Sequence, residues 1–117
     1  MTSEEYVEER IEKGFKRLGL PPYMKDGVVL WVTRGIRPGG FLMAVMENSL
    51  VDAFLRADDN NTSAMRDWAN FVYNDLPAGC HGSTQKVREW ASMGGLKEKA
   101  AIPGEENDGQ KTNQPSE

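Results

Sequence analysis

Apolar residues recur every three or four positions along most of this chain, which is the spacing of one face of a helix. The first segment shows the pattern at Val7, Ile11, Phe15 and Leu18. Thr2 and Glu5 before it match a capping box, and Gly19 after it is a typical helix end. The sequence therefore predicts an N-terminal amphipathic helix within residues 1–20.

A second helix is predicted from Tyr23 to Arg34. It follows the break at Pro21-Pro22 and precedes Gly35, where a left-handed residue would end it. The run from Val28 to Val32 is rich in β-branched residues, so a strand is the alternative. A helix is favoured because no other segment of the sequence offers a partner strand.

A third helix is predicted from Gly40 to Ala57. Its first half is apolar nearly all round, which is typical of a helix enclosed on every side. Its second half carries a polar stripe within about a third of the helical wheel. The stripe consists of Asn48, Ser49, Asp52 and Arg56. These side chains either face solvent or line a pocket.

Two further helices complete the expected fold. The turn from Asp58 to Asn61 supplies the N-cap of a helix from about Thr62 to Leu76, and Ser83 caps a last helix before Gly94. The buried positions are expected at Met65, Trp68, Ala69, Val72, Leu76, Val87, Trp90 and Ala91. We therefore predict an all-α fold, a compact bundle of about five short helices packed around the third. Residues 21–96 form the helical core domain and residues 97–117 a disordered acidic tail, poor in apolar residues.

Composition and charge narrow the function classes. The formal net charge of −4 disfavours a duplex nucleic-acid binder, which needs a basic face. The apolar runs are too short to span a membrane, and there is no secretory hydrophobic region. Cys80 is the only cysteine, so it has no partner for an internal disulfide. We expect a protein of the cytoplasm, with no membrane partner.

The candidate binding site is the loop that leads into the third helix. Glycines at a helix start leave backbone N–H groups pointing at an anion, and the helix dipole favours negative charge there. The site residues are Arg34, Arg37, Gly39, Gly40 and Phe41 around the loop, with Asn48, Asp52 and Arg56 as the far wall. The alternative is that the glycines only cap helices and both loop arginines lie in water. The loop lacks the Walker lysine and the dinucleotide fingerprint.

The remaining motifs do not assemble a catalytic or metal site. A calcium loop starting at Asp58 would have Ser63 and Ala69 where glycine and glutamate are needed. Cys80 and His81 are adjacent in sequence, and one residue of each type cannot complete a metal site or a triad. We therefore expect no catalytic residues, no metal ligands and no cofactor, and a protein that is not an enzyme.

A set of short motifs covers residues 23 to about 92. The motifs are Gly35-Ile-Arg-Pro-Gly-Gly-Phe-Leu42, Ala44-Val45, Asn48-Ser-Leu50, Ala53, Arg56-Ala-Asp58, Asn61, Val72-Tyr-Asn-Asp-Leu-Pro77, Gly82-Ser83 and Trp90. With these motifs the chain resembles a family of small uncharacterised bacteriophage and prophage proteins. It departs from the family pattern at Arg37, Ser49 and His81, where proline, aspartate and tryptophan are usual. The departures argue against a catalytic role for positions 49 and 81.

The resemblance implies an accessory protein of the host cell cytoplasm that binds a host protein or sequesters a nucleotide signal of host defence. The first hypothesis is a non-enzymatic protein that binds a small phosphorylated, nucleotide-like ligand at the loop. The alternative is a protein–protein interaction module that modulates a host factor, with aromatic anchors such as Trp31 or Trp90. A homo-oligomer is also expected, because the run from Phe41 to Met46 exposes apolar surface that short neighbours leave uncovered.

Overall fold

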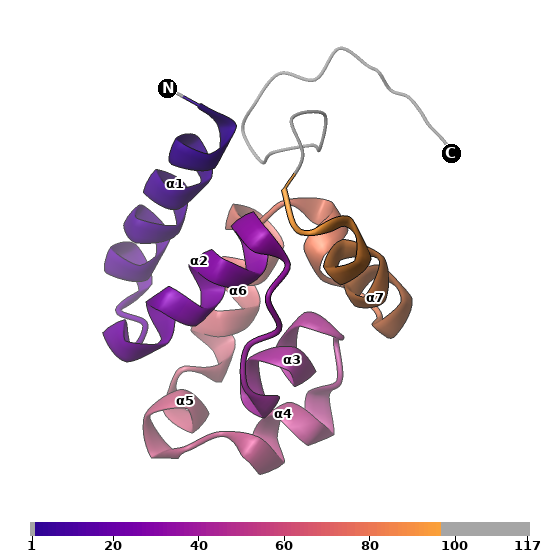
Figure 1. Cartoon of the computed structure of the whole chain (residues 1–117). Coiled ribbons are helices and arrows are strands. Elements are labelled where there is room, and N and C mark those ends of the chain that lie inside the picture. The colour runs from indigo at the N-terminus through magenta and orange to yellow at the C-terminus, as the bar shows by residue number, and fades with distance from the viewer. Residues whose placement is uncertain (1, 97–117) are drawn as a thin grey trace.

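The computed structural model describes residues 2–96, and over this range the chain is all-α, without a strand (Figure 1). The described elements are α1 (Ser3–Leu18), the 3-10 turn η1 (Pro22–Met24), α2 (Lys25–Arg34), α3 (Gly40–Met46), α4 (Leu50–Arg56), α5 (Asp59–Ser63), α6 (Met65–Asp75), the 3-10 turn η2 (Ala78–Cys80) and α7 (Thr84–Met93). The all-α prediction is confirmed. The number of helices is wrong, since the described range holds seven α-helices rather than five. The predicted disordered tail, 97–117, lies outside the described residues.

The first predicted helix forms with the expected ends. The Thr2 side chain accepts a hydrogen bond from the Glu5 N–H, and the Glu5 carboxylate accepts one from the Thr2 N–H, so the capping box is confirmed. Gly19 ends α1 in the left-handed region, with φ 67°. The second predicted segment is also helical rather than a strand: η1 leads into α2, and Gly35 ends α2 with φ 71°.

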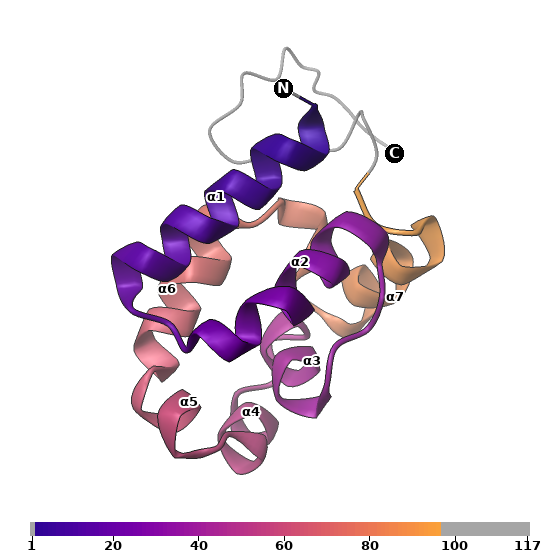
Figure 2. The same ribbon diagram turned by 60° about the vertical axis from the view of Figure 1, so that its left-hand side comes forward.

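The third predicted helix, Gly40 to Ala57, is interrupted. Asn48 adopts φ 63° and separates α3 from α4. The Ser49 N–H donates to the Ala44 carbonyl at 2.8 Å and the Asn48 N–H to the Val45 carbonyl at 3.1 Å. This pair of bonds is the Schellman motif that closes a helix C-terminus, and asparagine is the residue after glycine that best tolerates this conformation. The helix therefore stops at Met46, and α4 runs in a new direction (Figure 2).

The fourth predicted helix, Thr62 to Leu76, is divided as well. The Asp58 side chain accepts from the Asn61 N–H at 2.8 Å and so caps α5, which ends at Ser63. The helical path restarts at Met65 as α6. Asn61 is buried and accepts a hydrogen bond from the Trp68 indole at 2.9 Å, which ties the two pieces together.

The core forms where α1 crosses α6. Gly14 in the middle of α1 allows the close approach, because a Cβ atom there would lie 2.7 Å from the Phe71 ring. The Phe15 ring packs edge-to-face on Trp68 and on Phe71, at centroid distances of 5.6 and 5.2 Å. At the end of α6 the buried Asp75 carboxylate pairs with Arg17 at 2.7 Å. The N-terminal helix is thus packed into the same core as the rest of the described chain.

The second contact on which the fold depends joins α2 to α7. The Trp90 indole N–H donates to the carbonyls of Trp31 and Val32, at 3.0 and 3.2 Å. After α7, the backbone of the chain passes directly against the backbone at the end of α2. A Cβ atom on Gly95 would lie 2.6 Å from the backbone nitrogens of Arg34 and Gly35. Only glycine fits at this crossing.

We predict that Gly95→Ala lowers the free energy of unfolding by about 2 kcal/mol or more relative to Gly19→Ala. Both glycines have positive φ, but the space around Gly19 is open whereas Gly95 contacts backbone. Urea denaturation of the two variants measures the difference. Equal losses of stability would show that the close crossing at Gly95 is not formed in solution.

Candidate functional site

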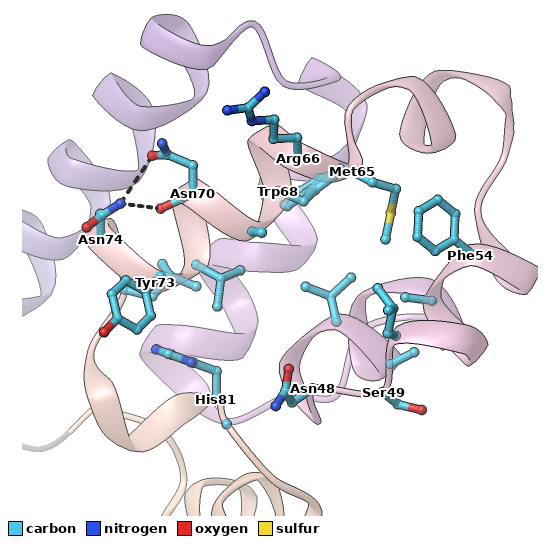
Figure 3. A pocket seen from close by; sticks show the side chains of 18 of the residues that line it. Asn48, Ser49, Phe54, Met65, Arg66, Trp68, Asn70, Tyr73, Asn74 and His81 are labelled. Atoms are coloured by element: carbon cyan, nitrogen blue, oxygen red, sulfur yellow. Dashed lines mark hydrogen bonds between the residues drawn. The ribbon is translucent and has the colours of Figure 1, made fainter.

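A groove of about 1340 Å³ separates α3 and α4 from α6 (Figure 3). Its lining residues are Ala44, Val45, Asn48, Ser49, Leu50, Ala53, Phe54, Met65, Arg66, Trp68, Ala69, Asn70, Val72, Tyr73, Asn74, Leu76, Ala78, His81, Gly82 and Lys86. The groove exists because the turn at Asn48 directs α4 away from the line of α3. A continuous helix from Gly40 to Ala57 would not produce this arrangement.

The surface of the groove is mostly apolar, and large side chains on its α4 wall are exposed. Leu50 is 65% exposed and Phe54 45% exposed. Met65 of α6 extends toward Phe54 at one end of the groove (Figure 3). Ala69, which the sequence analysis assigned to the core, is exposed and lines the groove instead. Apolar groups clustered in a concave surface are typical of a binding site.

The charged residues that line the groove are basic. Arg66 of α6 and Lys86 of α7 belong to the lining, and no aspartate or glutamate does. Neither cation forms an ion pair within residues 2–96. This is notable in a chain of net charge −4. The groove therefore presents apolar surface with positive charge at its edge.

The far end of the groove is closed by the segment after η2. The Gly82 N–H donates to the Met46 carbonyl at 2.7 Å, which holds this segment against the end of α3. His81 and Asn48 lie near each other at this end (Figure 3). On α6 the Asn74 side-chain amide donates to the Asn70 backbone carbonyl at 3.0 Å and to the Asn70 side-chain oxygen at 3.3 Å, so the two side-chain amides are held together along one edge.

The eight residues predicted as a ligand site are distributed over different places. Asn48 is the one of them that lines the groove. Arg34 pairs with Glu4 of α1 at 3.1 Å, at the other end of the loop from α3. Phe41 is buried, with its ring edge-to-face on Trp68 at 5.8 Å.

The loop end nearer to α3 does bring predicted residues together. A Cβ atom on Gly40 would lie 2.8 Å from a guanidinium nitrogen of Arg56, so the Arg56 side chain crosses the start of α3. Gly39 and Asp52 are exposed, and a guanidinium nitrogen of Arg37 lies 3.8 Å from the Met43 sulfur. The helix that starts here is seven residues long.

The Cys80-His81 pair has no arrangement typical of a nucleophile and a base. Cys80 is fully buried, and burial raises the pKa of its thiol far above the usual value, so the thiol stays protonated. Its backbone carbonyl accepts from the Trp31 indole at 3.0 Å, which is a structural role. Within residues 2–96, no group of three histidine, cysteine or acidic side chains is arranged to hold a metal ion.

Sequence reasoning missed the groove but the signal for it was present. Asn48-Ser49 has the composition of a helix C-terminus. Leu50 and Phe54, four residues apart, form an apolar stripe on α4. This stripe lies on a different side of the helix from the buried Ala53. Arg66 and Asn74, by contrast, lie outside that apolar pattern and are exposed at the groove edge.

Comparison with protein-family models, with curated proteins and with solved structures finds no match to this chain. The resemblance to small phage proteins stays a prediction. None of the helices within residues 2–96 has the length and apolarity required to cross a bilayer.

His81 yields a prediction of pH dependence. Burial, and secondarily the charge of Lys86, lowers the pKa of His81 from 6.5. The folded state thus favours neutral imidazole, and the unfolded state binds more protons just below pH 6.5. The free energy of unfolding should fall as the pH falls from 7 toward about 5, and this fall should be smaller in His81→Gln.

The measurement is urea denaturation at both pH values, together with an NMR titration of the imidazole. His81 is the only histidine in the sequence, so its signal is unambiguous. A titration midpoint at or above 6.5 would contradict the half-buried position of this side chain.

Proposed function

We propose that this protein is a non-enzymatic interaction module that binds an amphipathic helix of a partner protein, with acidic flanks, in the groove between α4 and α6. The observation that carries the proposal is the apolar groove with basic and no acidic residues in its lining. Helix-in-groove binding places the apolar face of the guest helix on such a surface.

The dimensions fit this occupant. The α6 wall is 11 residues long, which corresponds to about 16 Å or three helical turns. A guest helix of this length presents apolar side chains at positions i, i+3, i+4 and i+7. Leu50, Phe54 and Met65 are the side chains that such a stripe would contact.

The charge pattern supports the choice of partner. Arg66 and Lys86 are available for ion pairs with carboxylates beside the guest's apolar stripe. Complementary charges at an interface edge raise association rates and select against basic partners. Together with the resemblance to phage proteins, the proposal implies that the partner is a host factor in the host cytoplasm. A host factor as partner is also the alternative hypothesis drawn from the sequence.

The test uses two synthetic helical peptides with the same apolar stripe, one with glutamate and one with lysine at the remaining positions. The glutamate peptide should bind the full chain at least about tenfold more tightly. Fluorescence anisotropy measures both affinities. Equal binding of the two peptides would contradict the charge argument.

Variants locate the binding surface. Phe54→Ala should weaken binding of the glutamate peptide about tenfold because it removes an apolar contact. Leu30→Ala is the matched control: Leu30 is 44% exposed, as Phe54 is, but it lies on α2 outside the groove. Arg66→Glu together with Lys86→Glu should weaken binding similarly, with Lys13→Glu on α1 as its control. Equal effects of Phe54→Ala and Leu30→Ala would refute the groove as the site.

The second candidate is binding of a small phosphorylated ligand at the start of α3. One observation favours it: Arg56 brings positive charge against Gly40, where the helix dipole is already positive. An anion bound to the backbone donors of Gly39, Gly40 and Phe41 would relieve this repulsion. Arg37 is close enough along the chain to contribute a charge-assisted hydrogen bond.

Calorimetric titration with cyclic dinucleotides and with inorganic phosphate tests this candidate. We expect binding that Arg56→Met and Arg37→Glu each weaken about tenfold, while Arg88→Met on α7 leaves it unchanged. Absence of heat with every ligand, or equal binding by all three variants, would rule out an anion site at the start of α3. The proposal of helix binding in the groove would be unaffected.

A further inference from the structure

Helix α4 has more exposed apolar surface than the groove accounts for. A helix turns about 100° per residue, so Leu50 and Phe54 form one stripe and Val51 and Leu55 form the next. Val51 is 69% exposed and Leu55 77% exposed. Neither residue lines the groove.

Only the opposite side of α4 is buried in the described chain. Ala53 is 2% exposed and is the one buried residue of this helix. Both views place α4 at the lower edge of the molecule, away from α1 (Figures 1 and 2). The Val51–Leu55 stripe is therefore accessible to another molecule while the groove is occupied.

The sequence predicts a surface for self-association at Phe41 to Met46. This location is wrong, because Phe41, Leu42, Ala44 and Met46 are buried within the chain. The uncovered apolar surface lies one helix later, on α4.

A polar stripe beside Val51 and Leu55 indicates what covers them. Asp52 and Arg56 lie four residues apart along one edge of the apolar stripe. Neither forms an ion pair within residues 2–96. The edge thus carries a negative charge at its start and, at its end, the positive charge of Arg56, whose exposed side chain also lies against Gly40 of α3.

This order of charges is complementary to the same edge of a second helix that runs in the opposite direction. In a two-fold pair of antiparallel helices, each edge faces the same edge of the second copy, running in the opposite direction. Asp52 then faces Arg56 of the second copy, and Arg56 faces its Asp52. In a parallel two-fold pair, each charged edge would instead face the opposite edge of the second copy, which carries Leu50 and Phe54.

We propose that a second copy of this chain covers the outer face of α4, in a two-fold dimer with the two α4 helices antiparallel. Val51 packs against Leu55 of the second copy, and the two Asp52–Arg56 pairs lie along one side of this contact. On the other side of the contact, the Leu50–Phe54 edges of the two copies also face each other.

The small size of the contact sets its strength. A helix of seven residues is about 10 Å long, so the pairing buries less than the roughly 1,200 Å² of a standard stable interface. The dimer is therefore reversible and forms at high protein concentration.

Sedimentation velocity over a range of concentrations up to the millimolar level tests the proposal. The wild type should shift from monomer to dimer. Asp52→Arg and Arg56→Asp should each weaken the dimer about tenfold or more, since each replaces two attractive contacts by repulsive ones. The variant with both changes should recover dimerisation, because the opposite charges face each other again. Val51→Glu should remain monomeric.

All of these positions are exposed, and circular dichroism checks that each variant is folded. Lys13→Glu is the control for a change of surface charge. Arg66→Glu with Lys86→Glu should dimerise as the wild type does, which separates this proposal from binding in the groove. A wild type that stays monomeric at every concentration, or a doubly reversed variant that does not recover, overturns the proposal.

Discussion

The carbonyl end of α2 is the constraint on which the rest of the structure depends. The last carbonyls of a helix have no donors within the helix, and burying them without partners is costly. Here the Trp90 indole bridges the carbonyls of Trp31 and Val32, and the Leu96 N–H adds a bond of 2.9 Å to the Val32 carbonyl. Helix α7 is thereby fixed to the end of α2.

The groove is positioned by a series of contacts that starts there. The Trp31 indole donates to the Cys80 carbonyl, which fixes η2 against α2. Two residues later the Gly82 N–H donates to the Met46 carbonyl and so fixes the end of α3. From that point the turn at Asn48 directs α4 outward. The base of the groove wall is thus attached through η2 to Trp31 in the core.

The local elements could be predicted from the sequence because their signals are local. The capping box at Thr2, the left-handed glycines at 19 and 35 and the serine cap at Ser83 each involve a few neighbouring residues. The breaks at Asn48 and Ala64 were missed because an apolar pattern that continues across them outweighs a weak local signal.

The site was predicted less well, since it depends on residues distant in sequence. The pairing of Arg34 with Glu4 joins two helices and could not be expected from the loop alone. Phe71, fully buried at the crossing of α1 and α6, was not expected among the core residues. The groove requires α4 and α6 to be placed relative to each other, which no local pattern specifies.

The proposed binding of an acidic amphipathic helix between α4 and α6 can be observed directly. The most direct measurement is a ¹⁵N–¹H correlation spectrum of the labelled chain during titration with the glutamate peptide. The largest shifts are expected at Phe54, Ala69 and the Trp68 indole N–H. Shifts confined to Gly39, Gly40 and Phe41, or none at all, would contradict it.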